Sequence, residues 1–449
     1  MKLIYNVEDK PKFGQTIVFA IQQLLAIMAA TLVVPVIVGN GMSPAAALFG
    51  AGVGTLVYIL FTKGKSPVFL GSSFAFIGSM AAAFAGAASV AVGYLGIIIG
   101  AILAGLVYVI IAIIVKAVGV NWINKLMPAV VIGPTVSIIG LSLAGNAIGD
   151  LQKANAGGHT LIAVLCGLVT LLVTTLCSTY GKKSGRLIPF IYGILAGYAV
   201  AGIFTGIGAA AGVDALKVTD FSSIKALYAD GITLKTFVTV PEFTFITALG
   251  GFKEISGAYV GTVAMAYIPV AFVVFAEHIA DHKNISSIIG RDLLEEPGLS
   301  RTLLGDGVGS MAGAFFGGCP NTTYGESVAC VAITRNASVV TIITTAVLAI
   351  LISFLSPFVA LVNSIPACVM GGVCVALYGF IAVSGLKMVQ KVDLNQNKNL
   401  FVVSAILIAG IGGLSLTFGK ITITSIATAL ILGIVLNIIL SKGKEEEAE

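Results

Sequence analysis

The residues best suited to chemistry lie in one short polar segment, Gly318–Glu326, which reads Gly-Cys-Pro-Asn-Thr-Thr-Tyr-Gly-Glu between two long apolar runs. A carboxylate at bilayer depth is costly, so it usually faces a polar cavity or a substrate pathway. Proline and glycine interrupt a helix there, and free backbone groups at such a break line binding sites in transporters. We interpret Glu326 as a substrate acceptor or proton site. The alternative is a helix-terminus charge satisfied by nearby amides, for which Asn321-Thr322-Thr323 could provide a cap.

A second group of acidic and imidazole side chains follows the apolar run that ends at residue 276. Glu277 is interpreted as another substrate or proton site, the alternative being a charge at the membrane interface. Histidine in general titrates near physiological pH, so His282 suits a proton relay, or else lies at the cytoplasmic interface. Asp306 is a candidate for proton coupling or a cap of the next helix. His278 and Asp281 are expected on other faces, in packing or at the interface.

The composition excludes a soluble protein. The chain has 449 residues, of which 57% are hydrophobic and 10% charged, against about 25% charged in soluble domains. The net charge of +5 is spread in short clusters, which indicates cytoplasmic loops and no nucleic-acid surface. Six cysteines lie mostly in apolar runs without zinc spacing, and no nucleotide-binding motif occurs. We therefore expect a membrane protein that is not an enzyme and has no cofactor or metal.

The apolar runs predict an all-α polytopic membrane protein with about fourteen segments. A helix needs about 20 apolar residues to span a bilayer. Two apolar stretches, 66–76 with the residues just after it and 320–334, are too interrupted to span as regular helices. Twelve longer segments begin near residues 14, 44, 92, 127, 158, 186, 255, 303, 337, 366, 399 and 421.

The positive charges support an even number of segments with both termini in the cytoplasm. If the N-terminus is inside, the cytoplasmic connections hold most of the 25 lysines and arginines. Such an excess is what the positive-inside rule predicts. Only six then lie outside, namely Lys153, Lys217, Lys225, Lys235, Lys253 and Lys420.

The least apolar stretch, 206–254, divides the segments into two groups of seven. The predicted first repeat is 14–205 and the second is 255–441, between a cytoplasmic N-terminus at 1–13 and a cytoplasmic tail at 442–449. Each interrupted segment is third in its half. Paired broken segments in corresponding positions are typical of inverted-repeat transporters with a site near the membrane midplane.

Several short motifs stand out along the chain. They are Gly71-Ser72-Ser73-Phe74-Ala75-Phe76, Ala276-Glu277-His278-Ile279, Asp292-Leu293-Leu294 with Pro297-Gly298-Leu299, Pro320 to Glu326, Ala332-Ile333-Thr334-Arg335, Val369-Met370-Gly371-Gly372-Val373 and Leu377-Tyr378-Gly379. These motifs resemble those of the nucleobase–ascorbate transporter family, in particular its bacterial uracil permeases. The resemblance extends over about residues 14–440.

The resemblance implies proton-coupled uptake, or symport, of uracil across the cell membrane. It also implies a homodimer in which each protomer has a core domain and a gate domain. The extended pieces of the two broken segments would pair across the core. Glu277 and Glu326 would bind the base, since ionised carboxylates accept hydrogen bonds from its N–H groups while backbone amides donate to its carbonyls. The implied substrate-binding residues are Glu277, Glu326, Phe74, Gly325, Tyr324 and Tyr378, and the proton-coupling residues are Glu277, His282 and Asp306.

The chain departs from the family pattern at two places. It has Gln22-Gln23 where the family commonly has a Gln-His pair, and Ser327-Val328-Ala329 where the wider signature has Asn first and Gly third. Purine and xanthine members usually carry glutamine at the position of Glu326, which favours uracil here. A xanthine or other purine:proton symporter is the alternative. An anion exchanger, a channel and a membrane-embedded hydrolase with a His278/His282 metal site fit the sequence less well.

Overall fold

The computed structural model describes residues 3–119, 122, 128–154, 157–229, 231–418 and 421–441. The predicted tail at 442–449 lies outside these residues, as do Lys420 and the first two residues of the predicted N-terminal segment.

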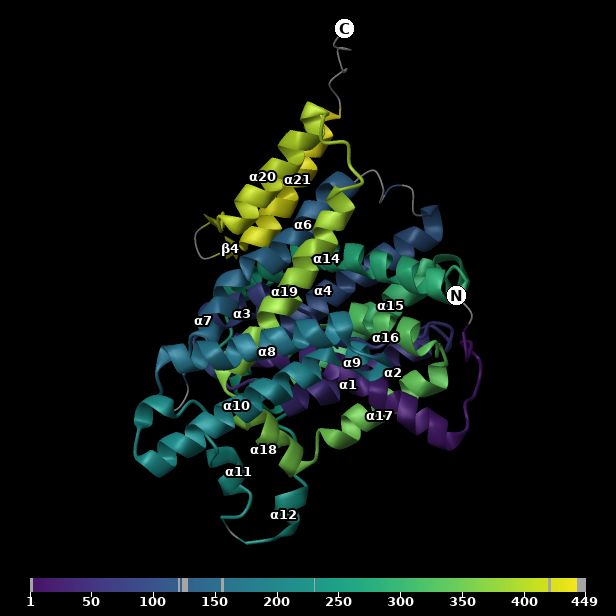
Figure 1. The fold of residues 1–449 in the computed structure, drawn as a ribbon. Coiled ribbons are helices and arrows are strands. Elements are labelled where there is room, and N and C mark those ends of the chain that lie inside the picture. Colours follow the sequence, from purple (N-terminus) through teal and green to yellow (C-terminus); the bar gives the residue numbers. More distant parts are fainter. Residues whose placement is uncertain are drawn as a thin grey trace.

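Helices dominate the first part of the chain (Figure 1). They are long where apolar residues are continuous and short where proline, glycine or polar residues interrupt them. The elements are α1 (Phe13–Val38), α2 (Pro44–Phe61), β1 (Leu70–Ser72), α3 (Ile77–Ala85), α4 (Val90–Val118), α6 (Ala129–Ser142), α7 (Ala144–Leu151), α8 (Thr160–Tyr180), α9 (Lys183–Leu187) and α10 (Pro189–Ala211).

Short helices follow α10, which itself continues past the predicted boundary at residue 205. These are η1 (Asp214–Leu216), α11 (Ser222–Ala226), α12 (Leu234–Phe237), α13 (Thr244–Ala248) and η2 (Leu249–Lys253). They occupy the polar stretch that the sequence predicts between the two halves.

The second part repeats the alternation of long helices with an extended interruption, β2, and ends with a short strand pair, β3 and β4, before the last helix. Its elements are α14 (Gly257–Ile289), η3 (Leu294–Gly298), α15 (Leu299–Gly317), β2 (Asn321–Thr323), α16 (Gly325–Thr334), α17 (Val339–Ile352), α18 (Ser356–Ser364), α19 (Ala367–Val389), α20 (Asn397–Ile411), β3 (Leu416–Phe418), β4 (Ile421–Ile423) and α21 (Ser425–Leu440).

Eight helical stretches among the described residues are long and apolar enough to cross a membrane by themselves. Shorter apolar helices, such as α16 and α17, supplement them. The chain is therefore a multi-pass, mainly helical membrane protein.

The two interrupted segments meet in a short antiparallel strand pair. β1 pairs with β2 so that Leu70 faces Thr323 and Ser72 faces Asn321. The Ser73 amide donates to the Pro320 carbonyl at 2.9 Å, which extends the ladder. The pairing that the resemblance implies is therefore present. It satisfies backbone groups that an interrupted helix leaves without partners, which is essential where water is absent.

Glycines bring α2 and α15 close together beside this strand pair. A Cβ atom at Gly54 would lie 2.7 Å from the Gly309 carbonyl oxygen, closer than real side chains permit. Such small-residue faces let membrane helices approach each other closely. Asn321 of β2 donates from its side chain to the Gly50 carbonyl at 3.1 Å, which ties the strand to α2.

The helices pack as two groups. The first group, α1 to α4 with α14 to α17, surrounds the strand pair, and the second group consists of α6, α7, α8, α10, α19, α20 and α21. In Figure 1, α20 and α21 lie together near one end of the molecule, and α11 and α12 lie near the other. The short helix α9 contacts both α8 of the second group and α16 of the first.

The N-terminal segment is bound to the first group. The Ala337 amide donates to the Tyr5 carbonyl at 2.9 Å, and the Val339 amide donates to the Val7 carbonyl at 3.0 Å. Glu8 forms an ion pair with Arg291, at the end of α14. The Arg291 guanidinium holds the pKa of the Glu8 carboxyl below its ordinary value.

Candidate functional site

A cavity of about 420 Å³ lies between the two helix groups, within the size range of small-molecule sites. It is lined by residues of α1, α6, α8, α9, α10, α14, α16 and α19 and by the segments next to β1 and within β2. Its charged lining residues are three carboxylates and one guanidinium, namely Glu277, Asp281, Glu326 and Arg186. Salt bridges elsewhere in the described chain involve none of these four residues.

Glu326 reaches the cavity because β2 ends one residue before the turn into α16. Tyr324 is extended, and no side chain caps the start of α16. The side-chain cap that residues 321–323 could provide is therefore not formed. Asn321 instead donates to the Gly50 carbonyl, and Thr323 donates to Asp281. Gly325, the first residue of α16, is exposed at the cavity, and amides at a helix start have no partner within their own helix.

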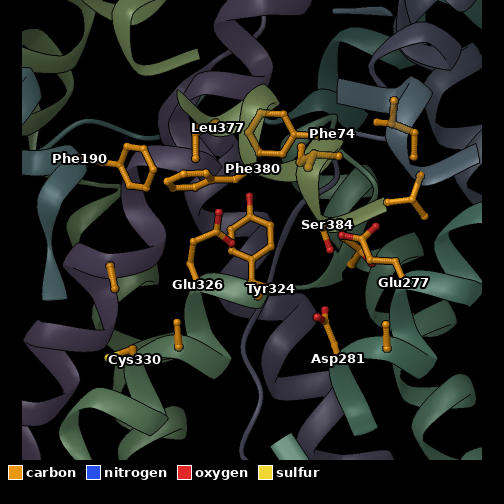
Figure 2. Close-up of a pocket in the computed structure, with 18 of the residues that line it drawn as sticks. Phe74, Phe190, Glu277, Asp281, Tyr324, Glu326, Cys330, Leu377, Phe380 and Ser384 are labelled. Carbon is orange, nitrogen blue, oxygen red and sulfur yellow. The ribbon is translucent and has the colours of Figure 1, made fainter. Parts of the chain in front are cut away.

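Glu277 and Asp281 enter the cavity together from one face of α14. Four residues advance an α-helix by about 40° beyond one full turn, so the two carboxylates share that face. Thr323 Oγ1 donates to Asp281 Oδ2 at 2.8 Å, which links α14 to β2. The expectation that Asp281 points to another face is wrong. In Figure 2, Glu277 and Glu326 project from opposite sides of the view, with Tyr324 drawn between them.

His282 lies on a different side of α14 and is absent from the cavity lining. Five residues advance a helix by about 140° beyond a full turn, which turns His282 away from Glu277. Its side chain is fully buried, with Nε2 at 2.7 Å from the Tyr58 hydroxyl. Tyr58 in turn donates to Ser66 Oγ at 2.6 Å. The predicted direct network with Glu277 is therefore replaced by a separate polar network behind α14.

His278 and Asp306 join α14 to α15 in the same buried layer. His278 Nδ1 lies 2.7 Å from Asp306 Oδ2, and its Nε2 lies 3.0 Å from Thr302 Oγ1. Asp306 is seven residues after the start of α15 at Leu299, so it is not the predicted alternative, a helix cap. Neither side chain lines the cavity. In the described part of the chain, no group of three candidate metal ligands includes the histidines.

Aromatic side chains form the apolar walls of the cavity. Phe74 lines it directly, and its ring centroid lies 5.9 Å from that of Tyr378 in an edge-to-face arrangement. Tyr378 is buried behind Phe74 and does not itself line the cavity. Phe190 and Phe380, which the sequence analysis does not single out, also line it (Figure 2).

Tyr324 is held rigidly beside Glu326. Its hydroxyl donates to the Ser72 carbonyl at 2.8 Å, and its ring packs on Gly71, where no Cβ atom fits. The side chain therefore forms a fixed wall that depends on the β1–β2 pairing.

The two departures from the family pattern meet in the structure. Gln23 Nε2 of α1 donates to Ser327 Oγ at 2.5 Å, and the Phe69 amide donates to the same oxygen at 3.0 Å. Gln23 and Ser327 are both buried. The pair therefore joins α1, the start of α16 and the segment before β1, directly behind Glu326.

Comparison with known proteins agrees with this architecture. The chain matches the model of the permease family over residues 14–419. It is 39% identical over 451 residues to the uracil permease of Bacillus caldolyticus, covering 100% of this chain and 97% of that protein. The chain belongs to the xanthine/uracil permease family. It is also 38% identical to the uracil permease of Bacillus subtilis, covering 100% of this chain and 98% of that one. Its relatives are named permeases, which are transporters and not enzymes.

A more distant relative and two solved structures extend the comparison. The uracil permease of Escherichia coli K12 is 35% identical, over 97% of this chain and 93% of that protein. The transmembrane domain of the cyanobacterial bicarbonate transporter BicA matches with a TM-score of 0.62 at 13% identity, covering 96% of this chain and 99% of that domain. Murine Slc26a9, an anion transporter in the inward-facing state, matches with a TM-score of 0.65 at 11% identity, over 97% and 69%. At these identities the structures show a shared fold alone.

Proposed function

We propose that this permease takes up uracil together with protons. Two findings support the substrate: full-length relatives are uracil permeases, and one cavity combines hydrogen-bond acceptors with free backbone donors. The observation that carries the proposal is the convergence of Glu277, Asp281 and Glu326 on the uncapped start of α16. A net negative lining also disfavours an anion as substrate.

The proposed binding mode pairs each polar edge of uracil with an opposite group. Uracil has two N–H donors, which the carboxylates of Glu277 and Glu326 accept. Its carbonyl oxygens accept from the amides of Gly325 and Phe74. The amides at the start of α16 also carry the positive end of the helix dipole, which favours a carbonyl oxygen there. Phe74 and Tyr324 then cover the faces of the ring.

Proton coupling follows from the crowding of like charges. Carboxylates that share one site repel each other, so binding a proton to one of them stabilises the others. Uracil N–H groups interact differently with a charged and a neutral carboxylate, which provides the coupling free energy. We assign Glu277 and Asp281 to the proton site because they share one face of α14. His282 and Asp306 then support α14 from behind, with no direct contact to the substrate.

We further propose the topology that the charges predict. It has fourteen segments in two inverted repeats of seven, with residues 14–205 and 255–441 on either side of an extracytoplasmic connection. Both termini lie in the cytoplasm, and the working unit is a homodimer. The first helix group acts as the core and the second as the gate. The cavity then faces the cytoplasm, because its outer lining comes from the ends of α8, α16 and α19, whose following loops carry lysine or arginine.

Uptake of radiolabelled uracil by purified protein in liposomes tests the proposal. The wild type, Glu326→Gln and Glu277→Ala are compared with and without an inward proton gradient. We expect uptake by the wild type that the gradient stimulates and that both substitutions abolish. If the folded wild type takes up xanthine and no uracil, the proposed substrate is wrong. If uracil uptake is the same with and without the proton gradient, uracil remains the proposed substrate and the proposed proton coupling is wrong.

A further inference from the structure

One cation shares the cavity with three carboxylates. Arg186 lines it together with Glu277, Asp281 and Glu326, and no other lysine, arginine or histidine of the described chain does so. Guanidinium groups pair readily with carboxylates in a bidentate manner. Arg186 therefore contributes the positive charge in the net charge of the cavity when no substrate is bound.

Arg186 lies on α9, the short helix that connects α8 to α10. Its Nη2 donates to the Thr179 carbonyl at 3.1 Å, close to the end of α8. The side chain is exposed and forms no ion pair with a described residue in this conformation. One hydrogen bond to the Thr179 carbonyl therefore holds the Arg186 side chain at the mouth of the cavity. A small movement of the side chain can replace this bond with one to another acceptor.

Arg186 lies beside the turn of α16 that carries Glu326, because its neighbour Leu187 packs against α16. Leu187 is buried against Cys330 of α16 and Ala26 of α1. Cys330 follows Glu326 by four residues, so the two side chains share a face of α16 about 6 Å apart along its axis. A cavity that closes at this mouth brings the guanidinium towards Glu326.

We propose that Arg186 is the counter-charge of the empty carrier and pairs with Glu326 once uracil has left. In the loaded carrier Glu326 is occupied by a uracil N–H group. After release its carboxylate has no partner, and an uncompensated charge is costly in a site that closes away from water. Pairing with Arg186 lowers that cost and permits the empty core to return. The inference rests on the proposed function and adds a residue on the gate side to it.

The test separates the return of the empty carrier from the movement of the loaded one. Net uptake into uracil-free liposomes requires the empty carrier to return, whereas exchange of labelled for unlabelled uracil does not. For Arg186→Gln we expect exchange within about twofold of the wild type and net uptake lowered by about tenfold or more. Arg186→Lys keeps the charge and should recover a large part of net uptake. Lys182→Gln removes an exposed cation of the same connection outside the cavity lining and should change neither rate.

The possible outcomes distinguish this inference from the proposed function. Equal losses of exchange and net uptake in Arg186→Gln, with wild-type levels of folded protein, would assign Arg186 to substrate binding or structure and overturn the proposal. Unchanged net uptake would also overturn it. If the wild type exchanges no uracil, the proposed substrate is wrong and the inference fails with it. If Arg186→Gln does not fold, Arg186→Lys decides: exchange at the wild-type level with a large part of net uptake retained would support the counter-charge, and a large loss of either rate would overturn it.

Discussion

Replacement of Ser327 by alanine should destabilise the protein far more than the loss of one hydroxyl suggests. Ser327 Oγ accepts from the Phe69 amide and from the side chain of Gln23, and all of these groups are buried near Glu326. Alanine leaves the Phe69 amide without a partner and leaves Gln23 Nε2 only its longer contact with the Ser327 carbonyl oxygen, at 3.4 Å. A buried unsatisfied donor costs about 1–3 kcal/mol, so we expect a total loss of about 2–4 kcal/mol in the free energy of unfolding.

A double-mutant cycle makes the reasoning quantitative. Gln23→Met leaves Ser327 paired with Phe69 and should cost about 1 kcal/mol. The double variant Gln23→Met/Ser327→Ala has no glutamine amide that could lose its partner. Its loss of unfolding free energy should therefore be less than the sum of the two single losses by about 1–2 kcal/mol. Ser142→Ala is the matched control, because that hydroxyl bonds only the Ile139 carbonyl of its own helix. The control should stay within about 0.5 kcal/mol of the wild type.

Equilibrium unfolding in mixed micelles measures these free energies, and uracil binding reports on Glu326. We expect Ser327→Ala to weaken binding as well, because Ser327 follows Glu326 in the first turn of α16. If Ser327→Ala costs no more than the control, or if the single costs are additive, the two hydrogen bonds do not hold the site and the argument is refuted.

Three further predictions concern other contacts. Gly71→Ala forces a Cβ atom into the Tyr324 ring and should weaken uracil binding, whereas Gly78→Ala meets open space and should bind normally; equal affinities would contradict the fixed wall. Thr323→Val removes the hydrogen bond to Asp281 and should lower proton-driven uptake by about tenfold at wild-type protein levels, since hydrogen bonds to charged groups contribute about 1.5–3 kcal/mol. Glu8→Gln breaks an exposed ion pair and should cost at most about 1 kcal/mol at neutral pH. Because Arg291 lowers the pKa of Glu8, this contribution is present at neutral pH and lost as the pH falls through that lowered pKa, which melting curves at several pH values will show.

The long-range plan of the chain follows from its apolar runs. The predicted segment starts differ from the observed helix starts by no more than four residues, with 303 against Leu299 and 421 against Ser425 as the largest differences. Hydropathy succeeds here because a lipid environment requires continuous apolar helices. The interruptions at 66–76 and 320–334 are equally visible, since proline and polar residues rarely occur at that depth.

The cavity itself was predicted only in part. Glu277, Glu326, Phe74, Tyr324 and Gly325 are in its lining as expected, because each adjoins a helix break or ends an apolar run. Asp281, expected on another face, lines the cavity because it is four residues from Glu277, whereas His282, five residues from Glu277, does not.

Contacts between distant segments leave little signal in a single sequence. The Gln23–Ser327 bond spans 304 positions. Arg186 looks like one of several cytoplasmic cations until the packing of α9 against α16 brings it to the cavity. Such pairings depend on the tertiary arrangement, which residue type and spacing alone do not specify.

The β1–β2 pairing also has a consequence for the order in which the chain is synthesised and inserted into the membrane. β1 is made about 250 residues before β2, so its backbone groups enter the membrane with no partner strand until the second half of the chain arrives. Each unsatisfied group costs several kcal/mol in hydrocarbon. The nascent first half must therefore keep Leu70–Ser72 in contact with water or with the translocation machinery until Asn321–Thr323 is inserted. A chain that stops before β2 would lack both the partner strand and Glu326, and it would be a substrate for membrane quality control.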